Sequence, residues 1–278
     1  MRINMLKDKL TLVIHTCDKF SDLWDGHIRL LKINWSDCPL KILLVTDKPT
    51  DRSFEGVEVF AAGEGKQLSQ RIAAVLPEIE TEYLLQTLDD YFPIYPVKTE
   101  KIDALVQAMD KEQLDYIRLF KRPDSRDRIE GYDSLYHIRF DGNQDIHYQV
   151  NMYPGIWRKS FVEMTVKKAL NAWDYELSLT RIAREKHLSC AMSKGRELEM
   201  LDVVRKGKLL HRAKRYFKKH PELYRGDRAV VPYRTEFMIW FRTKIKDLTP
   251  QSFVDALKRL THRFGATYYS DVNEVEKP

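Results

Sequence analysis

The chain has 278 residues, of which 43% are hydrophobic and 32% are charged, and its mean hydropathy is −0.49. This length is enough for one large α/β domain, or for one domain with an appendage. No apolar run approaches the ~20 residues that a membrane-spanning helix needs. His15 and Asp18 interrupt the only run that could form the core of a signal peptide, so we expect a cytoplasmic protein. Cys17, Cys38 and Cys190 are too few and too widely spaced for a disulfide framework or a zinc site.

The net charge of +6 is unevenly distributed along the chain. Residues 205–246 contain 14 Lys and Arg against 3 Asp and Glu, so the remainder of the chain carries a net negative charge. A basic C-terminal part behind an acidic front part suggests an anionic partner at one end of the molecule. The candidates are an anionic membrane surface, a phosphorylated acceptor and nucleic acid.

The front half alternates short apolar runs with helical patterns. Apolar runs bounded by turn residues predict strands, and apolar residues spaced three or four apart predict helices. In chain order they predict a strand at 10–16, a helix at 22–35, strands at 40–46 and 57–60, a helix at 66–76, a strand at 82–88, a helix at 99–109 and a strand at 115–120. This alternation predicts an α/β fold, with a mixed, mostly parallel sheet flanked by helices.

The pattern changes after residue 121. Residues 122–144 are polar and turn-rich, which predicts a loop excursion. A strand at 146–152, a turn at 153–157, a helix at 159–170 and a helix from 171 to about 186 follow. The C-terminal third is predicted to be mainly helical, because Leu209, Ala213, Tyr216 and Phe217 would line one face of a basic helix. We expect a main domain at 1–200 and a basic, mostly helical extension at 201–278.

Ligands of such sheets bind outside the carboxyl ends of the strands. Asp89 and Asp90, which directly follow the strand at 82–88, are therefore the most informative polar residues. Two adjacent carboxylates repel each other and favour a cation between them and an anionic ligand. Mg²⁺ or Mn²⁺ is usually held by one or two carboxylates together with substrate phosphates. An acidic turn that caps the next element is the alternative.

The segment Thr81–Pro93, which contains Leu88-Asp89-Asp90, resembles the metal-binding segment of bacterial GT-A glycosyltransferases of capsular polysaccharide, exopolysaccharide or lipopolysaccharide biosynthesis. The resemblance implies a GT-A-like (Rossmann-like) fold. It also implies an acidic motif whose metal, Mn²⁺ or Mg²⁺, bridges the diphosphate of a nucleotide sugar. This chain has Leu-Asp-Asp where the usual pattern is Asp-x-Asp. That difference leaves open which of the two carboxylates binds the metal directly.

Two later segments, 150–157 and 171–176, resemble the acceptor region of the same enzymes. There a tryptophan and an acidic residue at a helix start frame the acceptor, which implies acceptor-binding roles for Trp157 and Trp173. In inverting members a carboxylate near this position is the general base, and it can take the proton of an attacking hydroxyl within hydrogen-bonding reach. Glu176 is the first candidate and Asp174 the second. The alternatives are core packing for the tryptophans and a helix-start role for Glu176.

The resemblance further implies which residues bind the donor. In this fold the exits of the first two strands contact the nucleotide, and an arginine one turn into the helix before the metal-binding strand can approach a diphosphate. The candidate donor-binding residues are His15, Thr16, Asp18, Asp47, Arg71 and Asp89. Loop formation and capping are the alternative roles for the residues that follow the strands.

The predicted reaction is inverting transfer of a sugar from a nucleoside-diphosphate donor, most simply a UDP-sugar, to a hydroxyl of a cell-surface polysaccharide or a lipid-linked glycan. The basic segment 205–219 and the aromatic run 237–241 predict peripheral contact with the inner face of an anionic plasma membrane. Two alternatives remain. One is a nucleic-acid-binding protein that uses the basic region, and the other is an inactive GT-A-fold assembly partner. We expect no nucleic acid, because Asp89-Asp90 would then have no role.

Overall fold

An eight-stranded mixed sheet forms the centre of the protein. The computed structural model describes residues 3–121, 124–140, 148–238 and 241. The strand order is β3-β2-β1-β4-β8-β6-β9-β7, and all strands except β8 and β7 point in the same direction. The strands are β1 (Leu10–His15), β2 (Lys41–Thr46), β3 (Glu58–Ala61), β4 (Tyr83–Leu88), β6 (Tyr116–Arg118), β7 (Leu135–His137), β8 (Gly155–Arg158) and β9 (Cys190–Ser193).

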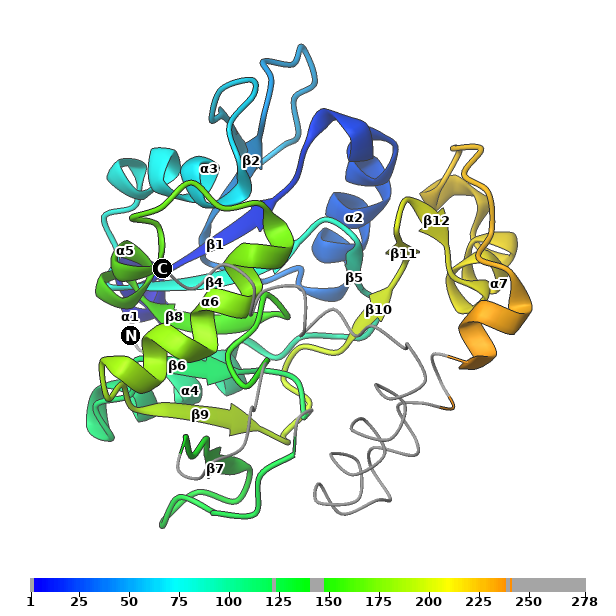
Figure 1. Cartoon of the computed structure of the whole chain (residues 1–278). Coiled ribbons are helices and arrows are strands. Elements are labelled where there is room, and N and C mark those ends of the chain that lie inside the picture. The colour runs from blue at the N-terminus through cyan, green and yellow to red at the C-terminus, as the bar shows by residue number, and fades with distance from the viewer. Residues whose placement is uncertain (1–2, 122–123, 141–147, 239–240, 242–278) are drawn as a thin grey trace, which may run out of the picture.

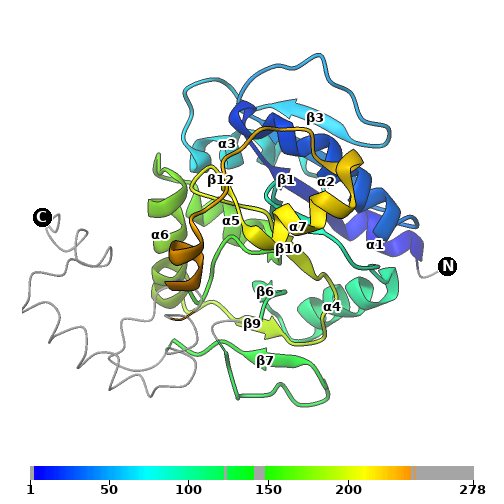
Figure 2. The ribbon, with the colours of Figure 1, turned by 90° about the vertical axis from the view of Figure 1, so that its right-hand side faces the viewer.

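Helices cover both faces of the sheet (Figure 1). One face carries α1 (Ile3–Lys9), α2 (Ser21–Asn34) and α4 (Thr99–Lys111), and the other carries α3 (Leu68–Val75), α5 (Lys159–Thr165) and α6 (Ala172–Glu185). Figure 2 shows the three layers with the sheet between the two groups of helices. Successive side chains of a strand point to opposite faces. Accordingly Leu12 of β1 packs in one apolar cluster and Val13 in the other, which is why the whole strand is apolar.

The predicted class, a mixed and mostly parallel sheet flanked by helices, is confirmed. The strands and helices of the front half lie close to their predicted bounds, and α3 ends at Val75, before the single-turn 3-10 helix that contains Pro77. The single-turn helices are η1 (Asp18–Phe20), η2 (Leu76–Glu78) and η3 (Pro221–Leu223). Within the described part of the chain, no helix is long and apolar enough to cross a membrane.

Two predictions for residues 146–157 were wrong. The predicted turn is strand β8, which lies antiparallel between β4 and β6. Pro154 and Gly155 gave the turn signal, but a Cβ on Gly155 would lie only 2.9 Å from a ring carbon of Tyr116. Glycine therefore stands here because a neighbour approaches closely. The strand predicted at 146–152 does not form over 148–152, which make turns and bends, and residues 146–147 lie outside the described ranges.

The segment after β9 returns to the front half of the chain. β10 (Met200–Asp202) pairs with β5 (Tyr91–Pro93), and β11 (Val204–Arg205) pairs with β12 (Lys208–Leu209) before the basic helix α7 (His211–Lys219). Short strands thus stand where helix was predicted, and the boundary at residue 200 stays a prediction. Phe217 of α7 and Phe92 of β5 share an apolar cluster with α2. A Cβ on Gly26 of α2 would lie 2.0 Å from the Leu223 carbonyl oxygen, so only glycine permits this approach.

Candidate active site

Polar residues gather at the edge of the sheet where the parallel strands end. The chain leaves β1 at Thr16, β2 at Asp47 and β4 at Asp89, and it enters the antiparallel β8 after Tyr153 and Pro154. Parallel pairing of β1 with β4 brings two of these exits together, and the Asp89 amide donates to the His15 carbonyl oxygen at 3.2 Å. This is the edge at which sheets of this type bind ligands.

Asp89 is buried and held by the exit of β1. Thr16 Oγ1 donates a hydrogen bond to Asp89 Oδ2 and accepts one from Trp24 Nε1 at 2.6 Å. The Asp89 carbonyl oxygen accepts from His27 Nδ1 of α2 at 3.1 Å. Arg71 Nη1 of α3 donates to the Thr16 carbonyl oxygen, so its guanidinium lies beside the same loop. Protein groups from both faces of the sheet therefore fix Asp89 in place.

Asp90 has different surroundings. Its carbonyl oxygen accepts from the Val203 amide at 2.9 Å, and Asp202 lies opposite Tyr91 in the β5–β10 pair, so β10 runs directly beside the acidic pair. Asp202 Oδ2 accepts from Arg205 Nη2 at 3.2 Å. Asp90 Oδ1 is buried and has no hydrogen-bond partner among the described residues. A buried oxygen without a donor is costly, and a cation would satisfy it.

Burial and repulsion both disfavour ionised carboxylates at this edge. Burial raises the pKa of Asp90 well above its ordinary value, and the charges of Asp89 and Asp202 raise it further. Burial also raises the pKa of Asp202 to about 6, although Arg205 opposes the shift. A divalent cation would offset this repulsion. The carboxylates present therefore fit a bound metal ion.

The protein alone offers few ligands to such an ion. Among the described residues, no three His, Cys, Asp or Glu side chains form a group that could hold a metal. Mg²⁺ characteristically keeps several waters and binds through one or two carboxylates plus substrate phosphates. The arrangement at Asp90 matches that open type of site, in which an anionic ligand completes the coordination.

Glu176 of α6 belongs to this edge. Its Oε1 accepts from the Met152 amide at 3.2 Å, just before β8, and burial raises its pKa. Burial also raises the pKa of Tyr91 well above its ordinary value, and the charges of Asp90 and Glu176 add to that shift. A carboxylate in the electrostatic range of Tyr91, the residue that follows Asp90, can act as a general base there once it is ionised.

Asp174 has a local role at the start of α6. The Asn171 side-chain oxygen accepts from the amides of Trp173 and Asp174, and Asn171 Nδ2 donates to Asp174 Oδ2 at 2.6 Å. These contacts form an N-cap. These local contacts account for the position of Asp174, and its predicted role as a second candidate base stays a prediction.

The two tryptophans differ. Trp157 of β8 is fully buried and packs on Tyr116 at 4.4 Å and Phe161 at 5.3 Å between ring centroids. It has no exposed surface for a sugar, so its predicted acceptor-binding role is wrong and core packing accounts for it. Trp173 is 50% exposed at the start of α6, which leaves its predicted role as a proposal.

Three aromatic side chains that sequence patterns did not single out line the same edge. The rings of Phe120 and Tyr153 stack at 4.4 Å with an interplanar angle of 17°, and Tyr91 lies 5.1 Å from Tyr153. Phe120 keeps 37% of its surface exposed. Because they come from the exits of β4 and β6 and the entry to β8, only the folded sheet brings them together.

The predicted donor-binding residues separate into two groups. His15 is buried, its Nε2 is hydrogen-bonded to Gln86 Oε1 at 2.8 Å, and burial lowers its pKa to about 4. It belongs to the core, so the prediction of nucleotide contact by its side chain was wrong. Asp18 and Asp47 meet at the surface, where the Asp18 amide donates to Asp47 Oδ1 at 2.6 Å. Arg71 Nε is buried without a partner among the described residues, as a group awaiting an anion would be.

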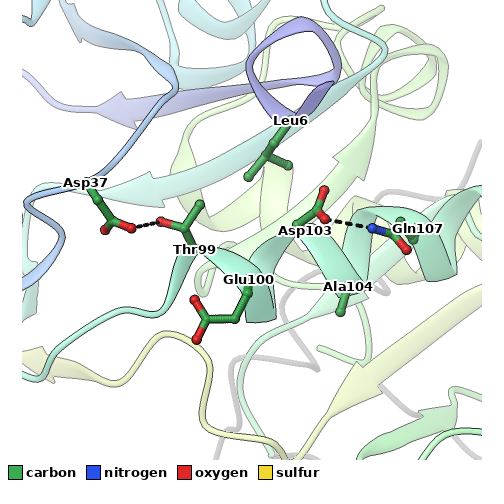
Figure 3. Close-up of a pocket in the computed structure, with 7 residues that line it drawn as sticks. All are labelled: Leu6, Asp37, Thr99, Glu100, Asp103, Ala104 and Gln107. Atoms are coloured by element: carbon green, nitrogen blue, oxygen red, sulfur yellow. Dashed lines mark hydrogen bonds between the residues drawn. The ribbon is translucent and has the colours of Figure 1, made fainter. Parts of the chain in front are cut away.

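A pocket of about 260 Å³ lies away from this edge, against α1 and α4 (Figure 3). Its polar groups are largely satisfied by one another. Thr99 Oγ1 donates to Asp37 Oδ2 at 2.9 Å, and Gln107 Nε2 donates to Asp103 Oδ2 at 2.6 Å. None of the predicted site residues lines it, so we do not assign the function there.

No protein-family model matches the chain, and no curated protein matches its sequence. Among solved structures, TarS 1-349 from S. aureus is similar, with 14% identity and a TM-score of 0.46 over 69% of this chain and 59% of that chain. Mannosyltransferase PcManGT from Pyrobaculum calidifontis, in complex with GDP-Man and Mn²⁺, has 11% identity and a TM-score of 0.46 over 79% of this chain and 65% of that chain. A cytidylyltransferase from Leptospira borgpetersenii has 12% identity and a TM-score of 0.41, covering 80% and 99% of the two chains. These structural similarities do not indicate which reaction the protein catalyses. That inference rests on the residues of the candidate site.

Asp202 and Arg205 are the site residues that sequence reasoning missed. They lie more than a hundred residues after the acidic pair, in a segment expected to be helical. The only signal was the alternation of Leu201 and Val203 around Asp202, which fits a strand with one polar face. Two apolar residues are too short a pattern to predict a strand without knowledge of its partner.

Proposed function

We propose that the protein is a metal-dependent glycosyltransferase that moves a sugar from a nucleoside-diphosphate donor to an acceptor hydroxyl. The observation that carries the proposal is the unpartnered, buried Asp90 Oδ1 at the carboxyl end of β4. Near it lie a half-buried carboxylate from Asp202 and the anchored Asp89. The Arg71 guanidinium lies beside the Thr16–Asp89 side of the same edge, and its Nε has no partner among the described residues. Carboxylates for a cation and an arginine for a diphosphate are the groups that nucleotide-sugar chemistry requires.

In this proposal Asp90 is the direct metal ligand, and Asp202 and Asp89 supply negative charge next to it. The Thr16 hydroxyl and the His27 imidazole hold Asp89 so that it cannot turn away. Bound Mn²⁺ or Mg²⁺ supplies charge that stabilises the departing nucleoside diphosphate. The protein contributes a fixed carboxylate on a rigid strand end, because misplacement of a charge by an ångström weakens such stabilisation strongly.

On the donor side, Arg71 would bind a phosphate oxygen through its Nε while its Nη1 stays on the Thr16 carbonyl oxygen. The hydrogen bond from the Asp18 amide to Asp47 links the loops that follow β1 and β2 next to this position. A carboxylate there can accept hydrogen bonds from the ribose hydroxyls or the base of the nucleotide. A UDP-sugar is the simplest donor that fits these groups.

On the acceptor side, Glu176 is the proposed general base. Burial raises its pKa towards the working range, which makes the carboxylate a stronger proton acceptor when it is ionised. The stacked pair Phe120 and Tyr153 offers an apolar ring face next to it. Such a face suits the C–H side of a sugar in a polysaccharide or a lipid-linked glycan. Attack from that side would invert the anomeric centre.

The test is the thermal stability of the protein with UDP, GDP, CDP and dTDP and their sugar conjugates, each with and without Mn²⁺. A ligand that binds the native state raises its stability by about 2.7 kcal/mol at a hundredfold excess over Kd. We expect one nucleotide to stabilise the protein only when Mn²⁺ is present, and its sugar conjugate to be hydrolysed or transferred.

Two other results would favour the alternative functions. If no nucleotide stabilises the protein and it binds nucleic acid in a salt-sensitive way, the nucleic-acid-binding alternative holds. Nucleotide binding without hydrolysis or transfer of any sugar conjugate would favour an inactive assembly partner of the same fold.

A further inference from the structure

An exposed basic surface covers the part of the chain that returns after β10. Between residues 206 and 238, nine exposed cations face two exposed acids, Glu222 and Asp227. We call the cations the basic face: Lys206, Lys208, Arg212, Lys214, Arg215, Lys218, Lys219, Arg225 and Arg234. Figures 1 and 2 show α7 and the segment after it on the outside of the molecule, beyond the end of the sheet toward which β1 and β9 point.

The basic face is held rigidly by the apolar side of α7. Ala213 and Phe217 are buried, and the Phe217 ring lies 5.5 Å from Phe92 and 5.0 Å from Tyr224. Because these contacts use the apolar side of the helix, α7 cannot turn that side into a bilayer without leaving the core. Its cationic side is the one that faces outward.

The charges of the basic face are not neutralised by the protein. In the part of the chain that the structure describes, none of the nine forms an ion pair. Exposed cations elsewhere do have partners: Lys41 lies 3.1 Å from Glu58 and Lys48 lies 2.9 Å from Glu64. An unpaired group of like charges raises the local potential and attracts an extended anionic surface.

Large apolar side chains adjoin the basic face. Tyr233 is 74% exposed, Phe237 51% and Met238 46%. Glu236 accepts from the His211 amide at 2.9 Å, and the Tyr233 ring lies 5.1 Å from His211, so this aromatic edge is attached to the start of α7. Exposed apolar groups next to cations are the combination that binds at the interface of a bilayer.

We propose that the basic face and the aromatic edge dock the protein on an anionic lipid membrane. The cations lie among the lipid phosphates, and Tyr233 and Met238 enter the headgroup layer. The aromatic edge favours a membrane over nucleic acid, because a flexible thioether such as Met238 gains from an apolar layer and offers no hydrogen bond to a base. Delivery of a lipid-linked acceptor to the strand-end edge rests on the proposed function, whereas membrane binding does not.

The first measurement is flotation of the full chain with vesicles of phosphatidylcholine alone and of phosphatidylcholine with phosphatidylserine, at physiological salt. We expect binding only to the anionic vesicles. A triple variant, Lys214→Gln with Arg215→Gln and Lys218→Gln, keeps good helix formers at exposed positions. Near an anionic membrane each such charge changes affinity about 5-fold, so the triple variant should lose on the order of 100-fold.

The matched control is Lys167→Gln with Lys168→Gln and Lys186→Gln, which removes three exposed cations that follow α5 and α6 in the chain and are not part of the basic face. We expect it to bind the anionic vesicles like the wild type. An equal loss in both triple variants would mean that net charge alone drives binding, and would overturn the proposed surface. Equal binding of the wild type to both kinds of vesicle would overturn it too.

Tyr233→Ala with Met238→Ala tests the aromatic edge. This double variant should release the vesicles at a lower salt concentration than the wild type, because only the screened ionic attraction remains. Tighter binding to RNA than to the anionic vesicles, with no effect of the double variant, would overturn the proposal in favour of nucleic acid. The nucleotide stability screen distinguishes this failure from that of the proposed function, since it requires no vesicle.

Discussion

Asp89 and Asp90 are neighbours in the sequence, but the fold treats them differently. Asp89 accepts a hydrogen bond from Thr16 and is held through its carbonyl oxygen by His27. Asp90 leaves Oδ1 buried without a partner in the described residues, beside the second acid Asp202. One carboxylate is therefore held by the surrounding protein, and the other has a buried oxygen without a hydrogen-bond donor, which the proposed function assigns to a metal ion. Two adjacent carboxylates therefore need not bind the same ion in equivalent ways.

The largest effect is expected from Asp90→Asn. Removal of a carboxylate that binds the metal should lower turnover on the order of 1,000- to 10,000-fold, since the ion contributes several kcal/mol to charge stabilisation. The same variant should be at least as resistant to urea as the wild type, because it removes charge repulsion and keeps the shape of the side chain. Urea unfolding and assay of sugar transfer measure the two quantities.

Asp89→Asn is the matched variant. It weakens the hydrogen bond from Thr16, but burial raises the pKa of Asp89 to about 7 and so disfavours its charge in the native state. The two effects oppose each other, so the free energy of unfolding should stay within about 1 kcal/mol of the wild type. Turnover should fall only about 10-fold, because this carboxylate shapes the site and does not bind the ion. Equal losses of turnover in the two variants would show that both carboxylates bind the metal and that Asp89 and Asp90 do not differ in role.

The next largest effect is expected from Glu176→Gln. Loss of a general base lowers turnover about 1,000-fold and leaves nucleotide affinity unchanged, since Glu176 lies on the acceptor side. Asp174→Asn is the control, because its carboxylate serves the N-cap of α6. Turnover and Kd for the nucleotide should be measured for both. Normal turnover of Glu176→Gln would remove it from the mechanism.

Sequence patterns located the exits of the parallel strands correctly and failed for segments that pair over long distances in the chain, for a physical reason. β1, β2 and β4 are buried on both faces, so they appear as apolar runs, and the topology of a parallel sheet puts Thr16, Asp47 and Asp89 at one edge. Arg71 also lies beside that edge, and its predicted contact with the donor stays a proposal. These signals are local, because each depends on a run of consecutive residues.

Residues that depend on distant pairing could not be predicted in this way. Gly155 suggested a turn, because the sequence cannot show that Tyr116 crowds its α-carbon. Trp157 was predicted to bind sugar, because nothing near it in sequence revealed that Phe161 would cover it. Asp202 acquires its role only through the register that sets it opposite Tyr91. Whether a tryptophan or a carboxylate faces solvent is decided by tertiary packing.

A smaller effect is expected from the groups that support Asp89. Burial lowers the pKa of His27 to about 4. The unfolded chain therefore takes up this proton first, and stability is lost as the pH falls from about 6.5 to 4. His27→Gln keeps a donor for the Asp89 carbonyl oxygen but does not titrate. Relative to the wild type, it should recover about 3 kcal/mol at pH 4 and nothing at neutral pH. A constant difference across the pH range would mean that His27 stays neutral for another reason.

The smallest effect tests whether the returning segment positions the donor loop. Arg228 donates to both Asp22 oxygens at 2.6 and 2.7 Å and to the Lys19 carbonyl oxygen at 2.7 Å, and its guanidinium lies 4.5 Å from the Phe20 ring centroid. Lysine cannot reproduce this planar fork. Arg228→Lys should therefore cost about 2 kcal/mol, or about 5 °C in Tm.

Exposed Arg225→Lys is the control for Arg228→Lys and should leave Tm unchanged. If the segment after β10 only covers α2, nucleotide affinity should be unaffected by Arg228→Lys. If it positions η1, which begins at Asp18, Kd should rise several-fold while the dependence on Mn²⁺ persists, because Asp90 keeps its surroundings. The second result would mean that residues far along the chain shape both sides of the proposed site, through Arg228 at the donor loop and Asp202 next to the metal.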